Sequence, residues 1–158
     1  MFKYHIPTTY KIKKLRKKWN SNENLLFLDF DGVFFCEKEF PTTIGKRIDK
    51  LIEEYDLKII ISSSWRYDLD ECQRILTEIG INKPISGSTT MEGLNRNDQI
   101  LDYLKKHPFN AIIVIDDSFL AKLVDYQIKC TFEYGFTAQL YEEAKILLDK
   151  QIRGCNEK

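Results

Sequence analysis

Residues 25–33 form an apolar run of strand length that ends in two aspartates and a glycine, Leu-Leu-Phe-Leu-Asp-Phe-Asp-Gly-Val. Asp29 and Asp31 therefore lie two residues apart at the end of a segment that favours burial. Two unpaired carboxylates buried together would cost several kcal/mol or be forced to protonate. A divalent cation removes this conflict, and hard oxygen ligands suit magnesium. The segment predicts a strand that ends at a reactive site, although Asp-Gly also occurs in ordinary turns.

Two further apolar runs end in polar residues. Residues 57–61 are followed by Ser62-Ser63-Ser64-Trp65-Arg66. Residues 111–115 are followed by Asp116-Asp117-Ser118. Ligands of an open parallel sheet bind outside the carboxyl ends of its strands. If the three runs are neighbouring strands, four carboxylates, several hydroxyls and an arginine meet at one crevice.

Apolar segments of strand length alternate with segments of helical periodicity along the chain. We expect strands at 25–29, 57–61, 84–86, 111–115 and 129–132. We expect helices at 10–19, 42–55, 68–79, 96–106 and 139–151. This alternation predicts an α/β, Rossmann-like fold in which helices cover both faces of a mostly parallel sheet.

Length and composition limit the class of protein. A chain of 158 residues with 43% hydrophobic and 30% charged residues is typical of one globular domain. No apolar run approaches the about 20 residues that span a bilayer, and the polar, basic N-terminus lacks the core of a signal peptide. We therefore expect a cytoplasmic protein without a membrane partner. Four cysteines without a C-x-x-C pair argue against a zinc site.

Charge is unevenly distributed although the formal net charge is zero. The first 20 residues hold seven Lys and Arg and no acid, and the remainder holds 17 basic and 24 acidic residues. The sequence thus predicts a basic segment at 1–24, a catalytic domain at 25–152 and a tail at 153–158. The basic segment either docks its apolar residues Ile12, Leu15 and Trp19 onto the body or binds a nucleic-acid backbone. Its charged residues are Lys11, Lys13, Lys14, Arg16, Lys17 and Lys18.

These motifs resemble those of the haloacid dehalogenase (HAD) superfamily. Asp29-x-Asp31-Gly32-Val33 is similar to its motif I, the serine cluster to motif II, and Asp116-Asp117 to motif IV. The Ser-Ser-Ser-Trp-Arg stretch and Gly135-Phe136-Thr137 resemble one branch, the HAD domain of Swiss Army Knife RNA-repair proteins. The resemblance covers about residues 25–150.

The resemblance implies a phosphatase with a covalent intermediate. Asp29 would attack phosphorus, and Asp31 would protonate the leaving oxygen and then activate water. Magnesium would be held by Asp29, the main-chain carbonyl of Asp31, Asp116 and Asp117.

Hydroxyls and cations would then hold the phosphate. One of Ser62, Ser63 and Ser64 would bind a phosphate oxygen, and Ser63 aligns best relative to Trp65 and Arg66. Arg66 would add a bidentate contact. Motif III requires a cation, for which Arg96 fits best, with Lys83 and Lys122 as alternatives. The superfamily usually has a lysine there, so Arg96 is a departure.

The intervals between motifs leave no room for a cap domain, which predicts an open site. Such a site suits the end of a macromolecule, so we expect removal of a terminal phosphate, such as a 3′-phosphate, from a polynucleotide. A phosphatase of small molecules such as nucleotides and a non-catalytic phosphate-recognition module are the alternatives. The intact Asp29, Asp31 and Asp116 argue against the module, since binding alone does not need all three.

Overall fold

The computed structural model describes residues 7–90 and 94–156, with side chains to 153. Within these residues one sheet contains five strands in the order β3-β2-β1-β4-β5, and every pairing is parallel. The strands are β1 (Asn24–Leu28), β2 (Leu57–Ile61), β3 (Ile85–Ser88), β4 (Ile112–Asp116) and β5 (Gln127–Lys129). The predicted Rossmann-like α/β fold is confirmed.

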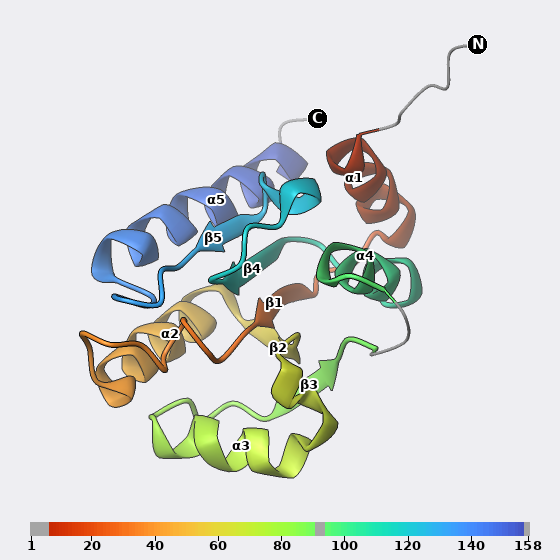
Figure 1. Ribbon diagram of the computed structural model, residues 1–158. Helices are drawn as coiled ribbons and strands as arrows, with labels where there is room; N and C mark the ends of the chain where they lie inside the picture. The colour runs from red at the N-terminus through yellow and green to blue at the C-terminus, as the bar shows by residue number, and fades with distance from the viewer. Residues whose placement is uncertain (1–6, 91–93, 157–158) are drawn as a thin grey trace.

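Helices cover both faces of this sheet (Figure 1). The α-helices are α1 (Thr8–Trp19), α2 (Pro41–Tyr55), α3 (Leu69–Glu78), α4 (Arg96–Lys106) and α5 (Ala138–Asn156). Two short 3₁₀ helices are η1 (Ser64–Tyr67) and η2 (Ala121–Leu123). Helices α2, α3 and α5 share one hydrophobic core with the sheet, and α1, α4 and η2 share the other.

The position of β1 at the centre of the sheet explains why its sequence is apolar at successive positions. Leu26 and Leu28 point into the core beneath α2 and α5, whereas Leu25 and Phe27 point into the core beneath α4. A parallel strand between two helical layers must be apolar on both faces. Because side chains alternate, the residue after Leu28 returns to the α4 face.

Two strands differ from the sequence-based prediction. The third strand runs to Ser88, two residues beyond the predicted end, and its pairing with β2 shifts register between Ile59 and Ile60. The fifth strand ends at Lys129, and the residues after it form a turn closed by the Gly135 N–H on the Thr131 carbonyl at 2.7 Å. This turn supports the loop after β1, since Phe136 N–H donates to the Val33 carbonyl at 2.9 Å.

Helix α1 docks firmly on the body, as one of the two sequence-based alternatives expected. Ile12 is buried, and the Trp19 indole N–H donates to the Leu104 carbonyl at 2.9 Å. Arg16 donates to Asn110 Oδ1 at 3.0 Å and to the Gln151 carbonyl at 2.7 Å. The boundary between a basic segment 1–24, a domain 25–152 and a tail stays a prediction.

The connections leave the carboxyl edge of the sheet open. Between β1 and β2 the chain forms one loop and α2, and between β2 and β3 it forms η1 and α3. Neither described connection carries an inserted cap domain, as predicted. Among the described helices, none is both long enough and apolar enough to cross a membrane.

Candidate active site

Three polar side chains follow the carboxyl ends of the three central strands. Asp29 follows β1, Ser62 follows β2, and Asp116 ends β4; their exposed fractions are 4%, 0% and 0%. Backbone hydrogen bonds keep these ends in register, since Asp29 N–H donates to Ile115 O and Ser62 N–H to Leu28 O, both at 3.1 Å. The residue before each lies in the α2-side core, so strand alternation points all three toward α4.

Three carboxylates converge at this edge. One oxygen from each of Asp29, Asp116 and Asp117 lies within 4.8 Å of the others. Burial and, second, the charge of Asp116 raise the pKa of Asp29 from 3.8 to about 7. A cation bound among these carboxylates would relieve their repulsion, and an all-oxygen donor set suits a hard ion such as Mg²⁺. The cluster therefore fits the metal that the sequence predicted.

The glycine of motif I makes room for one of these acids. Gly32 adopts φ +76°, and a Cβ atom there would overlap the Asp117 carboxylate. An L side chain is thus disfavoured at this position by both the left-handed backbone and the approach of Asp117.

Arg96, the first residue of α4, partly neutralises the acids. Its Nη1 lies 2.8 Å from Asp116 Oδ2 and 3.4 Å from Asp29 Oδ2. Burial by itself would lower the pKa of Arg96. The attraction of Asp116 and Asp29 outweighs burial and raises this pKa above its ordinary value. Asp116 also accepts the Ser118 N–H at 2.9 Å, which fixes its orientation.

The two alternative cations are engaged elsewhere. Lys83 pairs with Asp56 at 2.7 Å, and Lys122 pairs with Asp98 at 3.1 Å. Of the three candidates for the motif III cation, the structure brings only Arg96 to the acids.

The three serines have different surroundings. The Ser62 hydroxyl is buried and has no hydrogen-bond partner within the described part of the chain. The Ser63 hydroxyl caps η1 by accepting the Trp65 N–H at 3.2 Å. Ser64 is exposed and opens η1. The serine with free hydrogen-bonding capacity on the Asp29 face is therefore Ser62.

Arg66 lies beside the acids without contacting them. It lines a pocket of about 410 Å³ together with Ser64, Tyr67, Arg96, Gln99 and Ser118. Its Nη1 donates to the Ser63 carbonyl at 3.3 Å, and its buried Nε has no partner among the described residues. Burial and the nearby Arg96 lower the pKa of Arg66. Two guanidinium groups thus face one pocket, which is a setting for an anion.

The Asp31 side chain is exposed and lies outside the acidic cluster. One of its oxygens, Oδ2, accepts the indole N–H of Trp65 at 3.2 Å. Sequence reasoning did not anticipate this contact. It also missed Thr89, whose buried hydroxyl has no described partner and whose N–H donates to Ile61 O at 3.0 Å, next to Ser62.

The family model that matches this chain is described as the HAD domain in Swiss Army Knife RNA repair proteins, and the match covers residues 25–140. The chain belongs to this family. The matched range of this HAD domain contains the acidic cluster, the serines and both site arginines, which points to phosphohydrolase chemistry. No curated protein and no solved structure matches the chain.

Proposed function

We propose that this HAD domain is a magnesium-dependent phosphohydrolase that forms a phosphorylated aspartate at Asp29. The observation that carries the proposal is the convergence of Asp29, Asp116 and Asp117 within 4.8 Å at the carboxyl edge of the sheet. Beside them lie a buried hydroxyl on Ser62 and a guanidinium on Arg96, both suited to phosphate oxygens.

In the first step, an Asp29 oxygen forms a bond to phosphorus while the bond from phosphorus to the leaving oxygen breaks. Asp31 gives its proton to that leaving oxygen. In the second step, water attacks phosphorus and gives a proton to Asp31. The bond between Asp29 and phosphorus breaks, so that inorganic phosphate leaves and both aspartates return to their initial states.

Asp29, Asp116, Asp117 and the main-chain carbonyl of Asp31 would hold Mg²⁺. The bound ion offsets the repulsion between phosphate and the carboxylates and favours the ionised form of Asp29. Arg96 acts in the same direction, because its guanidinium lowers the pKa of Asp29 against burial and the charge of Asp116.

We assign the phosphate-holding hydroxyl to Ser62 in preference to Ser63, because Ser62 follows β2 level with Asp29 and on the same face of the sheet. The Ser63 oxygen is held at the cap of η1 by the Trp65 N–H. Ser62 can donate its hydroxyl proton to a phosphate oxygen without losing any described hydrogen bond. Arg66 would contact the group attached to the scissile phosphate, since it lines the adjoining pocket rather than the acidic cluster.

For the substrate we propose the phosphorylated end of a polynucleotide, such as a 3′-phosphate, in nucleic-acid repair. The family description, the uncapped site and the pocket between Arg66 and Arg96 support this class of substrate. A polyanion places a second phosphate near the first, and two guanidinium groups suit such a pair.

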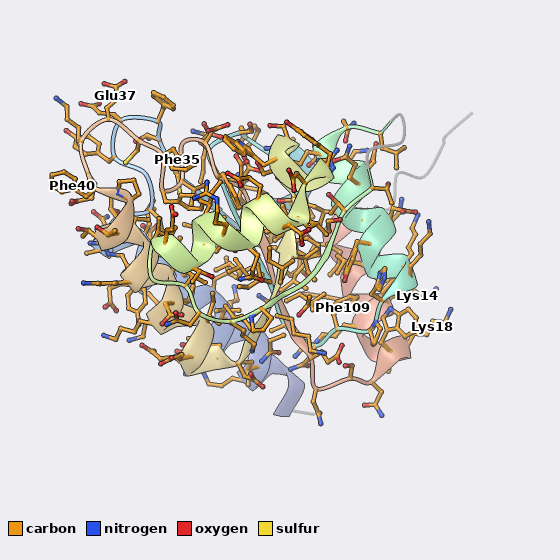
Figure 2. All side chains as sticks on the ribbon, turned by 90° about the horizontal axis from the view of Figure 1, so that it is seen from below. Lys14, Lys18, Phe35, Glu37, Phe40 and Phe109 are labelled. Atoms are coloured by element: carbon orange, nitrogen blue, oxygen red, sulfur yellow. The ribbon has the colours of Figure 1, made fainter. Side chains whose placement is uncertain are left out.

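A groove between α1 and α5 offers a second contact for a long substrate. It has a volume of about 1050 Å³, and its basic lining residues are Lys13, Arg16, Lys17, Lys150 and Arg153. Asn110 also lines it, so the groove opens near the amino end of β4, roughly 15 Å along the strand from the acids. Lys14 and Lys18 do not line this groove, and Figure 2 shows them far from the loop that carries Phe35 and Phe40.

A substrate panel tests the proposal. Wild type should hydrolyse 3′- or 5′-phosphorylated oligonucleotides in Mg²⁺ with higher kcat/KM than nucleotides or p-nitrophenyl phosphate, and EDTA should stop all of these reactions. Asp29→Asn, which cannot act as a nucleophile, is the matched inactive control. Preference for free nucleotides would favour the small-molecule phosphatase, and no turnover of any substrate would favour a recognition module.

Paired lysine variants test the groove. Lys13→Gln with Lys17→Gln should raise KM for a long oligonucleotide, and each lost phosphate contact should flatten the salt dependence of affinity by about 0.7 on a single strand. Lys14→Gln with Lys18→Gln removes the same charge from outside the groove and should have the smaller effect. Equal effects of the two pairs would contradict a role for the groove, and p-nitrophenyl phosphate should distinguish neither pair from wild type.

A further inference from the structure

We infer that Trp65 is a positioning residue that holds the Asp31 carboxylate in place for proton transfer. The inference rests on the proposed role of Asp31 as acid and base. Trp65 Nε1–H donates to Asp31 Oδ2 at 3.2 Å, and no other side chain of the described residues forms a hydrogen bond or ion pair with Asp31. An exposed aspartate with no such partner would exchange between rotamers, and proton transfer requires a defined one.

The backbone of Trp65 is fixed on both sides. Its N–H donates to Ser63 Oγ at 3.2 Å, and its carbonyl accepts the Asp68 N–H at 3.1 Å and the Cys72 thiol at 3.3 Å. Ser63 and Asp68 are the caps of η1 and α3. The short helix η1 therefore presents the indole from a rigid base.

The ring of Trp65 is fixed by aromatic neighbours from the loop after β1. Its centre lies 6.2 Å from that of Phe30 and 6.1 Å from that of Phe35. Phe30 is fully buried and separates the two motif I aspartates in sequence. Packing thus couples the indole to the segment that carries Asp31.

An indole suits this position because it is a hydrogen-bond donor only. Asp31 alternates between carboxylic acid and carboxylate during turnover. Oδ2 can accept the indole N–H in both states, which leaves Oδ1 to carry the proton that moves to the leaving oxygen and later arrives from water. An uncapped site has no cap residues that could orient its acid. Trp65 takes this role instead.

Replacing Trp65 by Phe tests the inference, because Phe keeps the ring and removes the N–H. kcat/KM reports phosphorylation of Asp29, which needs a proton donor when the leaving oxygen is an alkoxide and not when it is nitrophenolate. Trp65→Phe should lower kcat/KM roughly tenfold for a 3′-phosphorylated oligonucleotide or glycerol phosphate. The loss on p-nitrophenyl phosphate should be less than about threefold.

Two controls separate the possible failures. Asp31→Asn should lower kcat/KM more than Trp65→Phe does, and again mainly for the substrates with an alkoxide leaving group. If Asp31→Asn lowered kcat/KM equally for all substrates, the proposed role of Asp31 as the acid would be refuted. Trp19→Phe removes the other indole N–H, which donates to Leu104 O at 2.9 Å on α4, and should affect both substrates equally. If Asp31→Asn discriminates between substrates and Trp65→Phe does not, the positioning role is wrong while the proposed function stands.

A spectroscopic measurement tests the contact without turnover. The chain has two tryptophans, so its ¹H–¹⁵N spectrum holds two indole resonances, and Trp65→Phe assigns them. Asp31→Asn should shift the Trp65 indole resonance and leave that of Trp19 unchanged. The unchanged Trp19 resonance would show that Asp31→Asn is folded. An unmoved Trp65 resonance in that folded variant would overturn the inference.

Discussion

The raised pKa of Asp29 makes the metal-free protein less stable as the pH rises. Burial and the charge of Asp116 raise this pKa from 3.8 to about 7. The folded protein therefore keeps a proton that the unfolded chain releases, and its free energy of unfolding falls between pH 3.8 and about 7 and stays level above that range. Each pKa unit corresponds to about 1.36 kcal/mol, so the full loss is about 4 kcal/mol.

Asp29→Asn isolates this contribution, because the amide has nearly the same shape and does not titrate. Urea unfolding of both proteins in EDTA should show similar stability near pH 4. At about pH 8 the variant should be the more stable protein by about 4 kcal/mol. Comparing the two proteins at each pH cancels the titration of groups that do not interact with Asp29.

Magnesium should reverse this order for wild type. A bound cation compensates the ionised carboxylates, so saturating Mg²⁺ should stabilise wild type at about pH 8 and stabilise Asp29→Asn less. A difference between wild type and variant that stays constant with pH in EDTA would refute the account of the acidic cluster.

Three further variants probe the remaining parts of the site. Ser62→Ala should cost no stability, since its buried hydroxyl has no described partner, but should lower kcat/KM roughly tenfold in the phosphatase assay. Gly32→Ala should destabilise the protein by about 1–2 kcal/mol and weaken Mg²⁺ binding in calorimetry, because its Cβ would displace Asp117. Arg96→Gln leaves the fully buried Asp116 without its cation and should cost about 3 kcal/mol in urea unfolding with EDTA, and less with Mg²⁺. An unchanged stability of Arg96→Gln in EDTA would contradict the role of that ion pair.

The sequence predicted the sheet, and the proximity of Asp29 and Asp116 at its carboxyl edge, for a physical reason. The apolar runs before Asp29 and Asp116 are long enough to identify buried strands, and parallel strands bring their carboxyl ends to one edge. The meeting of the acids can therefore be predicted without knowledge of the loop conformations. Arg96 could be chosen for the same reason, since the predicted start of its helix, at 96, is the observed one.

Details that depend on loops could not be predicted as well. The surroundings of the Ser62 and Ser63 hydroxyls differ because Ser63 caps η1, a turn without a clear sequence pattern. The sequence did hold one signal for Ser62. It follows its apolar run directly, as Asp29 does, so the two side chains are expected on the same face of the sheet. Thr89 was missed because β3 runs past its predicted end, and Trp65 because its contact with Asp31 joins segments 34 residues apart.

Trapping the phosphorylated enzyme tests the central claim most directly. Wild type mixed with a phosphorylated oligonucleotide and Mg²⁺ should be quenched in acid within one turnover, digested and analysed by mass spectrometry. We predict a phosphoryl group on Asp29, lost on longer incubation and absent from Asp29→Asn and from samples with EDTA. Turnover of the substrate without any phosphorylated peptide, or with the phosphoryl group on another residue, would contradict the account.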